Sequence, residues 1–376
     1  MKRIALVILL AACASRPVDP GVARTQRLIA QQPDNPAFRY MLARHYDRLR
    51  DTRNVVRTLR RLDAMGWDLG IGPHHFASSR KDERFQRIAA KLERREQSVH
   101  RAATAFTFSK ERDVRSEGIA YDPVDDRFYF SGGAGALLRV DRMGAISELS
   151  IEPAGAKFEH LGMRIDAKRR HIWILAAVFD SNVSVDEKGR SMLSLYDLRD
   201  GRLLRRIHEG SPERRSILND IALLNDGTAF VTDTERNQLL RLAPNSDAFE
   251  VWAESFRGPN GIVASADEKT LYVADLFGIT ALDIATKSRQ LIDTNTPLNA
   301  IDGLTEHNGA LLAIQNNLGR PRIVRIHPDE KRVDVLEAKN SLLQVPSTAV
   351  IAGNELFFMA NRSNQPAERV VLKIAL

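Results

Sequence analysis

A segment of about 40–50 residues recurs six times after residue 115, and no other feature of the sequence restricts the fold as strongly. Each copy starts with a short turn-like head, continues as an apolar stretch and an Asp- or Asn-rich turn, and ends in an apolar or aromatic run. The equivalent head positions are Gly118, Gly162, Asp220, Gly261, Gly303 and Thr348. Their spacings are 44, 58, 41, 42 and 45 residues, which is too regular for an open sandwich.

Repeats of this length with four short strands each are typical of a β-propeller. We therefore predict an all-β six-bladed β-propeller over residues 105–376, preceded by a small α-helical segment. Residues 105–108 are expected to pair with the last blade and so close the ring. The 58-residue interval predicts an insertion of roughly a dozen residues in the second blade, around residues 179–190.

The preceding stretch, residues 22–100, has a helical sequence pattern. Apolar residues recur at helical spacing over 38–49 and again over 55–62, and a third helix is predicted over 82–96. The first pair resembles one degenerate tetratricopeptide unit. Because a single unit cannot bury a solenoid core, we expect it to pack on the following domain or to bind a protein partner.

The first residues have the pattern of an export signal. A cationic start precedes an apolar run over 4–12, which is too short to cross a bilayer as a helix. The run ends in Leu10-Ala11-Ala12-Cys13, which resembles a bacterial lipobox. Residues 1–12 are therefore predicted to be a lipoprotein signal peptide, and residues 13–21 a tether with a lipidated Cys13.

Two observations refine this prediction. Cys13 is the only cysteine, which favours lipidation over an ordinary signal peptide that happens to contain a cysteine; it also excludes a disulfide framework. Ala14 rather than an aspartate follows it. We therefore expect a bacterial cell-envelope lipoprotein, anchored to the outer membrane and facing the periplasm.

The charge is unevenly distributed. Residues 14–115 carry 22 Lys/Arg and 12 Asp/Glu, a net +10, whereas residues 116–376 carry 31 and 36, a net −5. Arg-rich helix faces are usually solvated, and no aromatic residues alternate with the basic ones as single-strand binding would need. We therefore expect no nucleic-acid partner.

Polar residues that head four of the repeats form the candidate site: Glu117, Asn219, Asn260 and Asp302. The innermost strand of each propeller blade lines the central channel, so these residues are expected to converge at its mouth. Two carboxylates and two amide oxygens make a ligand set of charge −2, which suits Ca²⁺ and less well Mg²⁺ or Mn²⁺. Asn-Gly and Asp-Gly pairs are also common in turns. However, four residues with side-chain oxygens occupy the same position of their repeats, which favours a metal site.

Four motifs carry a family resemblance: Glu117-Gly118, Asn219-Asp220, Pro259-Asn260-Gly261-Ile262 and Asp302-Gly303-Leu304. In this order they resemble the SMP-30/gluconolactonase/luciferin-regenerating-enzyme family, which is related to paraoxonase-type lactonases. The resemblance implies that Glu117, Asn260 and Asp302 are metal ligands and that Asn219 is a further ligand or a substrate contact.

The activity that the resemblance implies is metal-assisted hydrolysis of a small lactone or ester. Asp302 is the candidate base by analogy. His160, just ahead of the second repeat head, is an alternative base, or else a solvent-exposed loop histidine. The sugar-binding residues of sugar lactonases are not recognisable, so the sugar preference does not carry over.

Two other functions remain open. Propellers often only bind, so the chain fits a non-catalytic ligand- or protein-binding lipoprotein with a structural metal. A lyase of the streptogramin type is a third possibility on the same architecture.

Overall fold

In the computed structural model, the described residues are 18–72, 74–109, 114–132, 136–155, 158–179, 190–294, 296–316, 318–360 and 368–376. Contacts divide the chain into two compact units. The first comprises Met1–Gly66 and Phe76–Ile88, and the second Trp67–His75 and Ala89–Leu376. The predicted signal peptide and Cys13 lie outside the described residues.

Four helices precede the sheets: α1 (Pro20–Gln31), α2 (Pro36–Arg48), α3 (Thr52–Ala64) and α4 (Glu83–Arg95). The last three confirm the helical periodicity of the sequence. Helix α1 already includes the last two residues of the predicted tether, because Asp19 accepts hydrogen bonds from two backbone amides of the first turn and Pro20 suits the first helical position. Among the helices in the described part of the chain, none has the length and hydrophobicity needed to span a bilayer.

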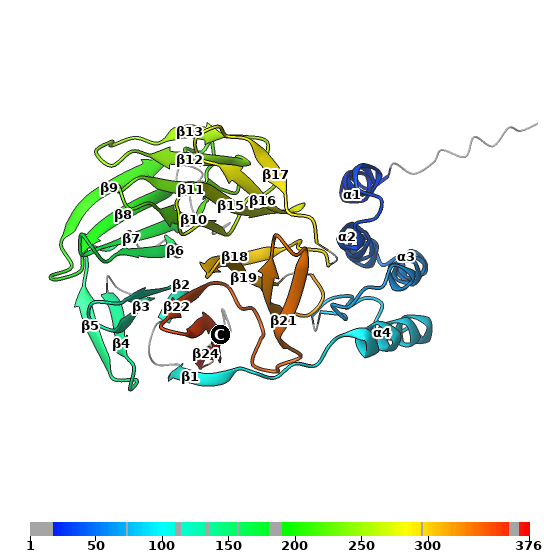
Figure 1. The fold of residues 1–376 in the computed structure, drawn as a ribbon. Coiled ribbons are helices and arrows are strands. Elements are labelled where there is room, and N and C mark those ends of the chain that lie inside the picture. Colours follow the sequence, from blue (N-terminus) through cyan, green and yellow to red (C-terminus); the bar gives the residue numbers. More distant parts are fainter. Residues whose placement is uncertain are drawn as a thin grey trace, which may run out of the picture. The chain divides into compact units, whose positions relative to one another are not determined.

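The second unit is a six-bladed β-propeller, as the repeat predicts (Figure 1). Each blade is an antiparallel sheet of four strands. The strand numbers follow the chain, and within each blade the strands are given in order from the axis outward. Blade one comprises β2 (Val114–Asp122), β3 (Arg127–Gly132), β4 (Ala136–Asp141) and β5 (Ile146–Ser150). Blade two comprises β6 (Glu159–Asp166), β7 (His171–Ala177), β8 (Ser191–Asp197) and β9 (Leu203–Glu209).

Blade three comprises β10 (Leu218–Leu223), β11 (Ala229–Asp233), β12 (Gln238–Leu242) and β13 (Glu250–Ala253). Blade four comprises β14 (Ile262–Ala264), β15 (Thr270–Asp275), β16 (Gly278–Asp283) and β17 (Arg289–Leu291). Blade five comprises β18 (Ile301–His307), β19 (Ala310–Gln315), β20 (Arg322–His327) and β21 (Arg332–Ala338). Blade six comprises β22 (Ala349–Ala352), β23 (Glu355–Met359), β24 (Arg369–Ala375) and β1 (Ala103–Phe108).

Blade six contains strands from both ends of the propeller sequence. Strand β1 pairs with β24 in the register Phe108↔Arg369. This confirms that residues 105–108 close the ring. The predicted insertion falls between β7 and β8, and its residues 180–189 lie outside the described part of the chain.

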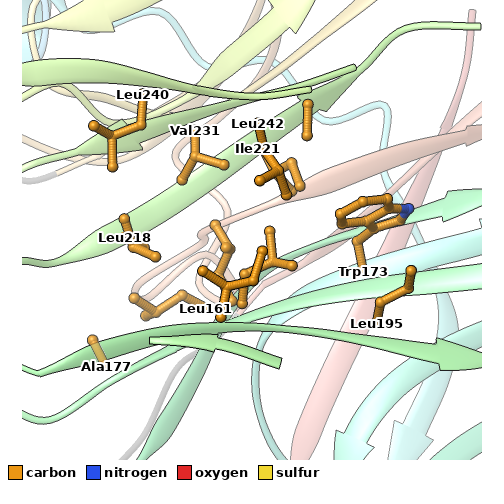
Figure 2. Close-up of a cluster of buried hydrophobic side chains, with 13 residues drawn as sticks. Leu161, Trp173, Ala177, Leu195, Leu218, Ile221, Val231, Leu240 and Leu242 are labelled. Carbon is orange, nitrogen blue, oxygen red and sulfur yellow. The ribbon is translucent and has the colours of Figure 1, made fainter. Parts of the chain in front are cut away.

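Apolar side chains fill the interface between every two neighbouring blades. The cluster between blades two and three contains Leu161, Trp173 and Leu195 from one blade and Leu218 and Ile221 from the other (Figure 2). Because both faces of each blade are covered, inner strands such as β11 and β19 are buried at every position rather than at alternate ones. The blades thus form a continuous core around the axis.

Candidate functional site

The repeat heads lie where neighbouring innermost strands come closest. A Cβ atom at Gly118 would lie 2.4 Å from the carbonyl oxygen of Leu161 in blade two. Real side chains do not approach a backbone oxygen so closely, so this position requires glycine. The same approach recurs from Gly162 to Asn219, from Gly261 to Asp302 and from Gly303 to Ser347, at 2.8, 2.4 and 2.5 Å.

Side-chain hydrogen bonds replace these glycine contacts in the two blades that lack the glycine. In blade three, Asp220 Oδ2 accepts a bond from the Ile262 amide of blade four at 3.1 Å. In blade six, Thr348 Oγ1 accepts a bond from the Ile119 amide of blade one at 3.2 Å and donates to the Glu117 carbonyl at 2.7 Å. The six head segments therefore form a closed ring around the axis.

The backbone is irregular at the heads. The pairing of an innermost strand with its neighbour shifts register between Val114 and Ile119 in blade one, and equivalent shifts occur in blades two, three and five. A β-bulge leaves a residue unpaired and redirects its side chain. The bulges thus release the head residues from the regular alternation of the strand.

The four predicted ligands all belong to this ring. Glu117, Asn219, Asn260 and Asp302 are half-buried, and they come from blades one, three, four and five. The corresponding residues of the other two blades, Leu161 and Ser347, are buried. No three His, Cys, Asp or Glu side chains in the described residues gather as a metal site, so a cation at the ring would also need amide oxygens.

Hydrogen bonds through blade six connect the two carboxylate heads. The Asn316 side-chain amide donates to Asp302 Oδ2 at 2.7 Å and to the Pro346 carbonyl at 2.5 Å. The next residue, Ser347, donates its hydroxyl to the Glu117 carbonyl at 2.7 Å. The sequence analysis missed Asn316, which follows the second strand of blade five. Thr234 is its counterpart in blade three, where it connects the Asn219 side chain to the Pro259 carbonyl. Because the two residues differ in type, the sequence repeat did not reveal them.

Threonines of blade three hold the two amide heads. The Asn219 amide nitrogen donates to Thr234 Oγ1 at 3.0 Å, and Thr234 Oγ1 donates to the Pro259 carbonyl at 2.6 Å. Thr232 Oγ1 donates to the Asn260 carbonyl at 2.7 Å. Since its nitrogen is bonded, Asn219 keeps its amide oxygen for a ligand. No described residue forms a hydrogen bond with the Asn260 side chain, which is thus also available.

Asp220 is a third carboxylate of the ring, and the sequence analysis assigned no role to it. It is 2% exposed, and Arg164 Nη2 lies 3.3 Å from its Oδ1 atom. Burial raises the pKa of Asp220, whereas Arg164 and the backbone amides lower it. An aspartate at a position that is glycine in four repeats was the signal that would have identified it.

A family model of the SMP-30/Gluconolactonase/LRE-like region matches residues 115–359, which is more than half of the chain. The chain belongs to this family. A search of curated protein sequences found no match. The family match spans all four motifs on which the resemblance was based.

This SMP-30/gluconolactonase-like chain is also similar to solved structures. A luciferin-regenerating enzyme is 13% identical, with a TM-score of 0.50 over 70% of this chain and 92% of its own. The PQQ-bound aldose sugar dehydrogenase of Streptomyces coelicolor is also 13% identical, with a TM-score of 0.49 over 73% and 97%. Virginiamycin B lyase from Staphylococcus aureus is 15% identical, with a TM-score of 0.47 over 73% and 98%. At these identities the similarity concerns architecture alone.

His160, the alternative base, is not in a loop in this SMP-30/gluconolactonase-like propeller. It lies in β6, pairs with Ala176 and is half-buried. Ala176 shares a strand face with Ile174, which packs between blades one and two, so His160 is on the face of blade two that is turned towards blade one. Burial, together with the positive charge of Arg206, lowers the pKa of His160 to about 4. The imidazole is therefore neutral near pH 7.

Proposed function

We propose that this propeller is a divalent-metal-dependent hydrolase of a small lactone or ester, with Ca²⁺ as its preferred cation. The observation that carries the proposal is the closed ring that holds Glu117, Asn219, Asn260 and Asp302. These side chains supply only oxygen atoms and a charge of −2, which matches a hard divalent cation.

All four residues would hold the cation, with Asn219 either a ligand or a contact to the substrate. When bound, a divalent cation supplies Lewis-acid polarisation of an ester carbonyl. The chain prepares this site in advance, because the Asn219 nitrogen is tied to Thr234 and the Asp302 carboxylate to Asn316. Preorganised groups of this kind need little rearrangement during the reaction.

We assign Asp302 as the base rather than His160. Asp302 would take a proton from water as the water oxygen attacks the ester carbonyl carbon, and would return it to the alkoxide oxygen when the ester C–O bond breaks. Asp302 is itself one of the head residues of the ring, whereas His160 precedes the head of blade two by one residue. The position of His160 on the face turned towards blade one also supports this choice.

The location of the protein is a further part of the proposal. The signal-like residues 1–12 and Cys13 support export and a lipid anchor, with the propeller facing the periplasm. The substrate would be a small molecule, and the helices before the propeller would serve a protein partner.

The test is hydrolysis of a panel of aldono- and acyl-lactones by purified protein from Ala14 onward, with and without calcium. Wild type is compared with Glu117→Gln and Asp302→Asn, and metal content is measured in each. We expect activity that is lost on chelation and in both variants. One equivalent of bound metal without turnover of any lactone would instead favour a non-catalytic binding propeller.

A further inference from the structure

We propose that Asn316 is a positioning residue for Asp302, which it fixes in the orientation required for the metal. This inference rests on the proposed function and adds a residue to its site. The Asn316 side chain donates to Asp302 Oδ2, so we place its effect on the site at Asp302.

The hydrogen bonds settle which way the Asn316 amide points. Its neighbours are a carboxylate oxygen of Asp302 at 2.7 Å and the carbonyl oxygen of Pro346 at 2.5 Å. Both neighbours can only accept, so the amide group must present its nitrogen to them. The NH₂ group has two hydrogens, and these two acceptors use both.

Asn316 is itself rigidly held. It is 2% exposed, its backbone amide donates to the Ala300 carbonyl at 3.0 Å, and its own carbonyl accepts from Leu318 at 2.8 Å. A hydrogen bond from a buried amide to a charged acceptor is stronger than one between neutral groups. The Asp302 carboxylate is therefore anchored to a fixed donor rather than to a mobile surface side chain.

Asn316 also connects Asp302 to the other acidic head. Pro346, its second acceptor, precedes Ser347, whose hydroxyl donates to the Glu117 carbonyl at 2.7 Å. A shift of Asn316 would therefore affect blades five, six and one together. Partners behind metal ligands typically contribute about 10–100-fold to metal affinity because they fix ligand orientation.

Calcium binding by the full chain provides the test, measured by isothermal titration with calcium chloride. The variant Asn316→Asp keeps the size of the side chain but removes both donors. Asn299→Asp is the matched control: Asn299 is also buried and lies two residues before β18 of blade five, but its amide donates to the Leu276 carbonyl, at 2.5 Å, rather than to a head residue. We expect Asn316→Asp to weaken calcium binding at least 10-fold and Asn299→Asp to leave it within about 2-fold.

The outcomes separate this inference from the proposed function. Calcium affinity that is unchanged in Asn316→Asp but lost in Asp302→Asn would overturn the positioning role alone. Equal losses in Asn316→Asp and Asn299→Asp would also overturn it, because they would indicate a general structural effect. If the wild-type protein binds no calcium, the proposed function and the inference are both overturned. If Asn316→Asp does not fold, Asn316→Ala, which adds no charge beside Asp302, is judged by the same criteria.

Discussion

Blades two and five use the same backbone geometry to carry opposite kinds of head residue. Both have a bulge in the innermost strand, and both have a glycine that touches the next blade. In blade two the head is Leu161, buried in the apolar cluster of Figure 2. In blade five it is Asp302, half-buried and bonded to Asn316. The ring is therefore a scaffold that does not depend on the chemistry of each head.

The largest expected effect tests the shared scaffold. Gly162→Ala and Gly303→Ala should each lower the free energy of unfolding by about 3–4 kcal/mol, because the new Cβ would lie 2.8 or 2.5 Å from a backbone oxygen. Urea denaturation measures this. Gly309→Ala is the control: it has a positive φ but open space, so it should cost only about 1 kcal/mol. A Gly162→Ala protein as stable as wild type would show that the two blades are not equivalent.

Substitutions of the head residues of these two blades should separate effects on stability from effects on calcium binding. Leu161→Ala should lower the free energy of unfolding by about 3 kcal/mol, because it leaves a cavity in the cluster between blades two and three, and calcium affinity should not change. Asp302→Asn should instead change stability by less than about 1 kcal/mol while abolishing calcium binding. Urea denaturation and calorimetric titration of the two variants decide this. Loss of calcium binding in Leu161→Ala would contradict the separation.

Blade five should respond to pH through Glu96, which packs against it. Glu96 Oε2 lies 3.2 Å from Arg320 Nε, yet burial outweighs the nearby cations and raises the pKa of Glu96 to about 7. The folded protein then binds a proton more tightly than the unfolded chain. Stability should therefore fall by about 2 kcal/mol as pH rises from 4.5 to 7, and stay constant above that. Thermal unfolding of Glu96→Gln across this range should lack this component; an unchanged slope would show that Glu96 is already ionised.

Blade two should show an effect of similar size and opposite sign through His160. Its pKa of about 4 in the folded protein lies below the usual 6.5, so the unfolded chain binds the proton more tightly. Stability should then decrease by about 2 kcal/mol as pH falls from 6.5 to 4. His160→Gln should lose this dependence in the same thermal scans, without loss of lactone hydrolysis near pH 7. A variant that keeps its stability profile but loses hydrolysis would restore His160 as a base.

The sequence was sufficient for the propeller, because each blade repeats the same order of head, strand and turn and the heads occupy equivalent positions. It also placed Glu117, Asn219, Asn260 and Asp302 on one ring. It was not sufficient for the contacts between blades. The bulges, the approach of Gly118 to Leu161 and the bond from Asn316 to Asp302 join segments that are distant in the chain, and local periodicity carries no information about them.

His160 shows the same limit on a smaller scale. Its position just before a head suggested either a base that faces the channel or a solvent-exposed loop histidine. Instead it lies in β6, before a bulge, on a face turned towards blade one. A shift of one residue exchanges the two faces of a strand. The position of such a bulge depends on the pairing with the neighbouring strand, so it cannot be read from the residues of β6 alone.

Blade six is built from both ends of the propeller sequence, and this determines when the ring can close during synthesis. The link between Asp302 and Glu117 passes through Pro346 and Ser347, and this blade is complete only when β24 has paired with β1. Among the strands of the six blades, β24 is the last to be synthesised. During synthesis, therefore, the chain has both carboxylates before the ring can close, and the ring closes only after β24 has left the ribosome.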